Sequence, residues 1–443
     1  MEFINSNSTF NLKSESDLFS IPAVQNTIEE GYFQEYRPVT PLSDDAPLEF
    51  LIPAQTMEYL DLSLTRLHLK LQIFKKNGNL LKGDTPATEK VAAVPGDNVA
   101  PINNLLHSLF SNVELFLNKK CVSASNMYHY RAYIENLLNY GSDAKSSHFG
   151  SLIWKKDTAG YMDSLIAADN QGFSERKDMF AKSCSVDLEG NLHCDLFNQN
   201  KHLLNGVEVN LKLHLNRNRV CLMSTTDDYK IKLKEATLVI RKLKYNPTVM
   251  IAHAKTLLHT TAKYHITRVE MKSITIPQYV QNKTLDNIFL GQLPKRIILG
   301  LVSSNAYNGT SNLNPFNFRN FGVCNVRIVS DSYIRSEPYS ADFTNGQYIS
   351  CYNGLFMATG KHQRDMGNEI SRNEYPNGYC LFAFDLTPDF CANNWNIQRS
   401  GSLGIDLKFS TPLDSTITAL VFAEFDNLVE IDKDRNILTD YCS

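Results

Sequence analysis

The stretch of sequence that decides the fold is VEVNLKLHL, residues 207–215, in which every second side chain is apolar. This period of two is typical of a β-strand with one face in a core and the other in solvent. The same period recurs on both sides of this stretch. Further segments with it are 60–64, 67–73, 113–117, 380–386 and 403–409.

One of these segments changes phase along its length. Apolar residues alternate up to Leu64 and begin again at Leu67, one position out of step. A slip of one residue would turn the second half of a strand onto the wrong face unless extra residues bulge out of the ladder. The sequence therefore predicts a bulge or sharp bend near Thr65 and Arg66.

Helical periodicity is rare in the chain. Apolar residues from Met127 to Leu138 follow helical spacing, and Gly141 can close a helix over 127–140. Asn246 followed by Pro247 is a cap and first-turn pair, which begins a second helix that extends to residue 258. Many short strands with few helices indicate an all-β sandwich or barrel.

The two halves of the chain resemble each other. Residues 209–213 (VNLKL) match 405–409 (IDLKF), and a further apolar strand follows each. Leu211 and Leu407 are equivalent and lie 196 positions apart. A period near 200 residues is too long for a solenoid but fits two copies of one β-sandwich. Chance likeness between two strands is the alternative explanation.

We therefore predict an all-β chain of two tandem eight-stranded jelly rolls, with a few short helices and an extended N-terminal arm. The expected division is an arm at 1–47, a first jelly roll at 48–245, a helical connector at 246–262 and a second jelly roll at 263–443.

Composition agrees with a globular protein and gives no sign of a nucleic-acid binder. The 443 residues are 43% hydrophobic and 21% charged, with a net charge of −3. The N-terminus has no signal-peptide pattern, and no apolar run reaches the roughly 18 residues of a membrane span. Nine cysteines are scattered and odd in number, so we expect reduced thiols and synthesis in the cytoplasm or nucleus, without secretion.

The arm differs from the rest of the chain. Residues 1–47 hold eight acidic and two basic residues, so the arm carries −6 and the body +3. Apolar residues lie between prolines over 17–42, which predicts that this segment packs on a surface. That surface is either its own domain or a neighbouring subunit. The candidate intersubunit residues are Leu18, Phe19, Ile21, Tyr32 and Phe33.

No catalytic, metal-binding or cofactor-binding set emerges. His253, His259 and His265 are six apart, which does not place them on one helix face. Asp385, Asp389 and Asp406 are best explained as turn and strand-end carboxylates, so we expect no enzyme. Lys230, Lys232 and Lys234 share a strand face, which is either solvated or, less favoured, directed at DNA.

Ten blocks of the sequence resemble the major capsid proteins of Polinton (Maverick) elements and adintovirus-like viruses. The strongest is NNLLHSLFS at 103–111, and Ala23-Val24 departs from the pattern, where the family tends to have proline and a polar residue. The other blocks lie at 18–22, 27–32, 47–50, 58–62, 130–133, 137–141, 156–160, 425–427 and 430–432.

The resemblance implies a structural function. Two upright jelly rolls per chain would form homotrimeric, pseudo-hexagonal capsomers and an icosahedral shell around double-stranded DNA, with weak or no DNA contact. The partners implied are neighbouring capsomers and a single jelly-roll penton protein, and the location is the virion. The helix at 127–140 would pack near the base or between the sandwiches. The alternative is a double-sandwich glycan-binding or hydrolytic protein without cofactors.

Overall fold

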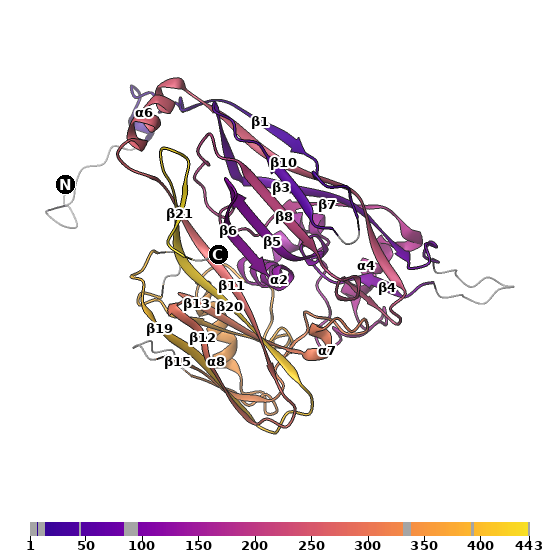
Figure 1. Cartoon of the computed structure of the whole chain (residues 1–443). Helices are drawn as coiled ribbons and strands as arrows, with labels where there is room; N and C mark the ends of the chain where they lie inside the picture. The colour runs from indigo at the N-terminus through magenta and orange to yellow at the C-terminus, as the bar shows by residue number, and fades with distance from the viewer. Residues whose placement is uncertain are drawn as a thin grey trace.

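The computed structural model describes residue 7 and residues 14–43, 46–83, 96–330, 338–390 and 394–441. Two β-sandwiches lie side by side, the first drawn in indigo to magenta and the second in orange to yellow (Figure 1). Alternating apolar residues of the facing sheets fill the cores, as the period of two predicts.

Two four-stranded antiparallel sheets form the first sandwich. The order in one sheet is β1 (Ile28–Tyr36), β10 (Tyr229–Tyr245), β3 (Glu58–Lys75) and β7 (Val186–Asn191). The order in the other sheet is β2 (Leu48–Ile52), β8 (Val209–Leu215), β5 (Phe110–Leu117) and β6 (Lys120–Asn126).

The second sandwich repeats this plan. One sheet contains β11 (Ala262–Ile276), β20 (Ile417–Ile431), β13 (Arg296–Ser303) and β18 (Leu381–Asp385), with β21 (Ile437–Thr439) added beside β20. The other contains β12 (Asn282–Gln292), β19 (Ser400–Phe409), β15 (Val323–Ser330) and β16 (Tyr339–Ser340). Two short ribbons pair β4 (Val99–Pro101) with β9 (Leu222–Ser224), and β14 (Phe318–Arg319) with β17 (Asn377–Gly378).

Both sandwiches have the strand order of an eight-stranded jelly roll. Taken in chain order, the first, eighth, third and sixth strands form one sheet, and the second, seventh, fourth and fifth form the other. Leu211 lies in β8 and Leu407 in β19, which are the seventh strands of their sandwiches. The predicted repeat is therefore confirmed, as is the predicted fold class.

Strand β1 was not expected from the sequence, because its residues lie in the predicted arm. It pairs with β10 from Ile28 opposite Tyr245 to Tyr36 opposite Leu238. The predicted division at residues 48, 246 and 263 stays a prediction, but strand pairing adds Ile28–Tyr36 to the first sandwich.

The predicted bulge occurs in β3. Its partner strand β10 pairs Val239 with Arg66 and then Arg241 with Asp61, so four residues of β3 lie opposite a single residue of β10. Within the bulge Leu64 is 41% exposed while Thr65 is buried. The extra residues return Leu67 to the core face, which is the phase change seen in the sequence.

Both predicted helices are present. Helix α2 (Tyr128–Asn139) lies between the sandwiches, where Tyr133 stacks on Phe316 of the second one with ring centroids 4.0 Å apart. Helix α6 (Pro247–Leu257) joins β10 to β11 at one end of the molecule (Figure 1). As predicted, Asn246 caps it by accepting the Thr248 N–H. The shorter helices are α1 (Leu105–Ser108), α3 (Ser142–Ser146), α4 (Gln171–Met179), α5 (Asn218–Cys221), α7 (Ser304–Tyr307) and α8 (Ile349–Ala358), with 3-10 turns η1 (Ser14–Ser16), η2 (His148–Leu152) and η3 (Ala181–Ser183).

Candidate functional site

The N-terminal segment at 14–26 is exposed along its whole length. Leu18, Phe19 and Ile21 are 77%, 95% and 88% exposed, and Val24 is 82% exposed. Apolar side chains of this size gain about 1.5–3 kcal/mol each on full burial. This segment, residues 14–26, is called the arm segment below, and it presents apolar surface that its own sandwiches leave uncovered.

The other two candidate residues lie elsewhere, in β1. The Tyr32 hydroxyl donates to a carboxylate oxygen of Glu58 at 2.5 Å, and this hydrogen bond, with burial, raises the pKa of Tyr32 to about 12. The Phe33 ring lies 5.0 Å from the Arg66 guanidinium. The structure therefore does not bring the five candidates together. Three belong to the arm segment and two to a strand of the first sandwich.

Strand β1 is also a sheet edge. Among the described residues it pairs along one side only, with β10. An edge strand presents main-chain N–H and C=O groups on which another chain can pair. The arm segment ends at residue 26 and β1 begins at Ile28, so the two features are adjacent in sequence.

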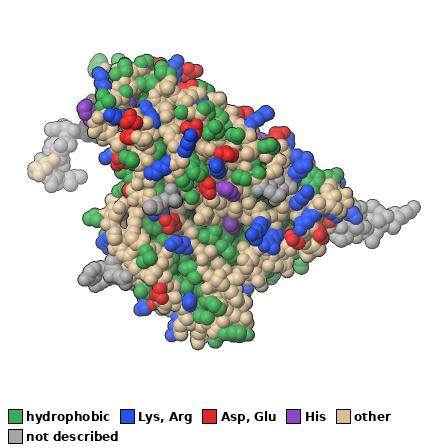
Figure 2. Space-filling view, in the orientation of Figure 1, with side chains coloured by type: hydrophobic (Ala, Val, Ile, Leu, Met, Phe, Trp, Pro, Cys, Tyr) green, Lys and Arg blue, Asp and Glu red, His purple; other side chains and the backbone are tan. Residues whose placement is uncertain are grey.

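The lysines of β10 face outward, as predicted. Lys230, Lys232 and Lys234 alternate with the buried Tyr229 and the buried Ile231 at the start of the strand. Figure 2 shows basic and acidic side chains interspersed over the visible face rather than gathered by sign. Acidic residues flank these lysines in the chain, namely Asp227, Asp228 and Glu235, which favours the solvated interpretation over the DNA-facing one.

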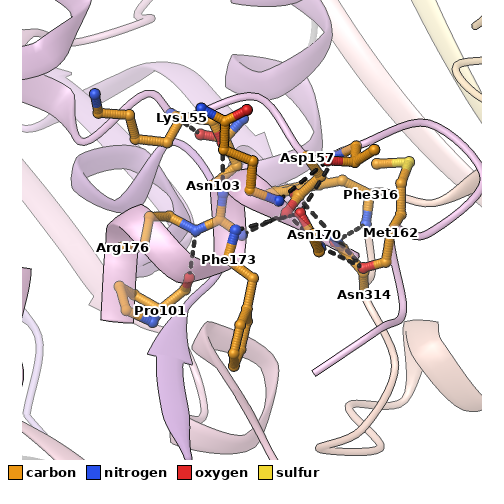
Figure 3. Close-up of polar contacts among 12 residues, drawn as sticks. Pro101, Asn103, Lys155, Asp157, Met162, Asn170, Phe173, Arg176, Asn314 and Phe316 are labelled. Carbon is orange, nitrogen blue, oxygen red and sulfur yellow. Dashed lines mark hydrogen bonds and ion pairs between the residues drawn. The ribbon is translucent and has the colours of Figure 1, made fainter. Parts of the chain in front are cut away.

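A buried polar network fastens the two sandwiches to each other (Figure 3). Arg176 donates to the Asp157 carboxylate at 2.6 Å, and both side chains are fully buried. Asn170 donates to the same oxygen at 3.0 Å, and Asn314 of the second sandwich donates to the other oxygen at 3.0 Å. Tyr379, also of the second sandwich, donates to the Asp157 main-chain oxygen at 2.6 Å. The two sandwiches are thus held in one fixed arrangement.

A second buried network is centred on α2. Arg131 donates to Glu135 at 2.9 Å and to Asp195 at 2.6 Å. Burial alone would raise the pKa of Glu135, but Arg131 and His193 outweigh it and lower that pKa to about 2. Asp195 also accepts the main-chain N–H of Val269 in β11 at 3.3 Å, so this network too reaches the second sandwich.

Two histidines beside this network make the fold sensitive to acid. Burial lowers the pKa of His129 from 6.5 to about 4, and burial with the neighbouring His193 lowers the pKa of His107 well below 6.5. Below pH 6.5 the histidines of the unfolded chain take up protons that those of the folded chain do not. The free energy of unfolding therefore decreases as the pH is lowered. We expect His129 alone to lower the free energy of unfolding by about 2 kcal/mol between neutral pH and pH 5. Glu135 is still ionised at pH 5, so its ion pairs stay intact.

Urea unfolding at pH 7.5 and pH 5 measures this effect, with His129→Gln as the comparison. The variant is expected to lose less stability between the two pH values than the parent chain does. An equal loss in both proteins would show that His129 does not carry the acid sensitivity.

Several of the residues considered for chemistry already have other partners. Asp385 accepts from Thr387, and Asp406 is bound to Arg327 at 2.6 Å. His253 contacts Tyr59, which places it in a packing role. The described part of the chain contains no group of three His, Cys, Asp or Glu side chains with metal-site geometry. It also contains no helix with the length and apolar character of a membrane span.

The described cysteines are free thiols, and four of them are buried: Cys194, Cys221, Cys351 and Cys380. Burial raises the pKa of Cys194 and of Cys221 to about 12, which makes both thiols poor nucleophiles. Cys391 and Cys442 lie outside the described residues.

The interdomain networks were not predicted from the sequence. Polar residues in loops have no periodicity, and Asn314 lies 157 positions from its partner Asp157. A signal was nevertheless present, because Asp157 and Arg131 fall in the blocks 156–160 and 130–133 that carry the family resemblance. Blocks of that kind mark positions worth testing for buried contacts.

Comparison with known proteins places this architecture among capsid proteins. A chain in the cryo-EM structure of the Sputnik virophage matches with a TM-score of 0.66, covering 99% of this chain and 94% of that one at 12% identity. The mavirus major capsid protein matches with a TM-score of 0.54, covering 99% and 97% at 11% identity. The chain has the double jelly-roll fold of viral capsid proteins.

Two further comparisons give one more match in structure and one match in sequence. The faustovirus major capsid protein has a TM-score of 0.54, covering 93% of this chain and 92% of its own at 9% identity. In sequence, an uncharacterised protein of Caenorhabditis elegans is 27% identical over 433 residues, 95% of this chain and 99% of the other. No protein-family model matches the chain. The likeness to the solved double jelly rolls is therefore one of fold along the whole chain.

Proposed function

We propose that the protein is a major capsid protein, a structural subunit without enzymatic activity. The observation that carries the proposal is the likeness to viral capsid proteins over nearly the full length of both chains, which includes both jelly rolls. The buried interdomain networks support it, because they hold the two sandwiches as one rigid block suited to repeated packing. In this proposal the chain is found in the virion.

The proposed assembly has three subunits. Three chains with two sandwiches each give a pseudo-hexagonal capsomer, and capsomers tile an icosahedral shell around double-stranded DNA. Neighbouring capsomers and a single jelly-roll penton protein are the proposed partners, with DNA contact weak or absent. The resemblance of the sequence blocks supports the narrower assignment to Polinton, Maverick or adintovirus-like capsid proteins. The scattered cysteines, which favour a reducing compartment, support synthesis in the host cytoplasm or nucleus.

The arm segment is the proposed intersubunit contact. Its exposed apolar residues and the adjoining β1 edge offer a neighbouring subunit both apolar burial and strand pairing. Stable assembly of this kind requires interfaces well beyond roughly 2,000 Å² in total.

Size-exclusion chromatography with light scattering, followed by electron microscopy, tests the proposal. We expect a species of three times the 50.2 kDa chain mass and hexagonal particles or shells at higher concentration. A protein that stays monomeric at every concentration, with no particle in the micrographs, would refute the capsid function.

A further inference from the structure

A cavity of about 380 Å³ opens beside the β3 bulge in the first sandwich. Its volume falls within the roughly 300–1,000 Å³ of small-molecule sites. Exposed residues at its mouth include His148, Ser151 and Asn198, while Thr65 and His107 lie buried at its floor. Bulges often re-aim side chains at functional sites, and here the bulge turns Thr65 inward.

Both floor residues have an unused hydrogen-bonding atom. Thr65 is 1% exposed and His107 is 0% exposed. Among the described residues, neither Thr65 Oγ1 nor His107 Nε2 has a hydrogen-bond partner. A buried polar atom without a partner costs about 1–3 kcal/mol, so a molecule that supplies the missing bonds would gain affinity.

The surrounding contacts leave His107 Nε2 open to a ligand. The Tyr128 hydroxyl accepts the main-chain N–H of His193 at 3.0 Å and lies 3.0 Å from His107 Nδ1. A hydroxyl can accept a second hydrogen bond or donate its own proton, so Nε2 acts as a donor or as an acceptor according to the tautomer. Burial lowers the pKa of His107 and keeps the imidazole neutral. The floor therefore presents a ring nitrogen and a hydroxyl, each of which can exchange a hydrogen bond with a ligand hydroxyl.

The charges around the cavity cancel among themselves. Arg66 pairs with Glu189 at 2.6 Å, and the Glu135 carboxylate beside His193 is already paired with Arg131 at 2.9 Å. A charged ligand would have to compete with these pairs, whereas a neutral one would not. Three aromatic residues complete the lining, namely Tyr140, Phe149 and Phe197. Hydroxyls, amides and aromatic faces together suit a neutral molecule with many hydroxyl groups.

We propose that this cavity is a binding site for a neutral saccharide of about one sugar ring. Sugar hydroxyls exchange hydrogen bonds with His107 Nε2 and with Thr65 Oγ1, and the apolar face of the sugar lies on the aromatic lining. The inference goes beyond capsid assembly and does not depend on it, because every residue involved belongs to one chain.

Saturation-transfer NMR on the full chain tests the proposal with glucose, galactose, mannose and N-acetylglucosamine at millimolar concentration. N-acetylneuraminic acid and inorganic phosphate serve as charged comparisons. We expect saturation transfer to at least one neutral sugar, and binding about tenfold weaker in Thr65→Val, which removes one hydrogen bond and keeps the side-chain shape.

A variant at the exposed mouth of the cavity tests the same site without altering the buried Thr65, where a substitution could disturb folding. Ser151→Tyr places a ring at the exposed mouth and should abolish the signal, while Ser146→Tyr, equally exposed on α3 but outside the lining, should preserve it. No transfer to any neutral sugar, or equal transfer in Ser151→Tyr and the parent, would overturn the proposal. Binding of the charged probes alone would overturn it as well. Because shell formation is scored separately, its failure would leave this result standing.

Discussion

A chain that lacks residues 1–24 is expected to fold as the full chain does but to lose most closed shells. Four large apolar side chains of the arm segment are removed, and in the isolated chain each is at least 77% exposed. Their burial against neighbours would contribute several kcal/mol per subunit at about 1.5–3 kcal/mol each. The shortened chain keeps Gln25, whose side chain accepts the Ile28 N–H at the start of β1.

A point variant makes the same test with less disturbance. Phe19→Asp should lower the yield of shells at least severalfold, measured by electron microscopy and sedimentation, with an unchanged urea midpoint. Ile166→Asp is the control, because Ile166 is 62% exposed and lies outside the arm segment. Formation of normal shells by Phe19→Asp would show that the arm segment is not part of the intersubunit interface. Unfolding of Phe19→Asp would instead place the arm in the core of its own subunit.

The second large effect is expected at the interdomain network. Asp157→Ala leaves the fully buried Arg176 guanidinium without its counter-charge and removes the acceptor for Asn314. We expect a loss of about 3–5 kcal/mol in the free energy of unfolding, because an unpaired buried charge is strongly destabilising. Urea unfolding measured by circular dichroism gives this value.

Two controls distinguish the effect of burying an ion pair from the effect of breaking any ion pair. Asp406→Ala breaks a pair with the same 2.6 Å distance, but Arg327 there is 59% exposed, so the expected cost is under about 1 kcal/mol. Combining Asp157→Asn with Arg176→Met removes the charge as well as its partner and should restore much of the loss. A similar loss in the free energy of unfolding for Asp157→Ala and Asp406→Ala would show that the buried network adds no more stability than an exposed ion pair does.

The strands that face a core on one side were predictable from the sequence. In β8 and β19 successive residues face the core and the solvent in turn, so the alternation of apolar residues predicts the burial of Leu211 and Leu407. The bulge in β3 was predictable for the same reason. After a change of phase in the alternation, a bulge returns the apolar residues to the core face of the sheet.

The edge strand and the networks were not predictable. In β1 all but three of the side chains are exposed, so IEEGYFQEY shows no alternation, and prolines on either side suggest a loop. Arg176 lies in α4, and Asp157 is brought to it by a loop whose course no local pattern specifies. The predicted arm at 1–47 stays a prediction as a division of the chain, and within it Ile28–Tyr36 pairs with a sheet of the first sandwich.

The connector α6 has an evolutionary consequence. Because one chain carries both sandwiches, each copy is free to change without breaking a symmetric partner. Strand β13 pairs with β20 in continuous register, whereas its counterpart β3 has three extra residues relative to its partner strand and a cavity beside them. Covalent linkage in one chain thus permits the two sandwiches to differ, with a regular ladder in one and a bulge with a cavity in the other.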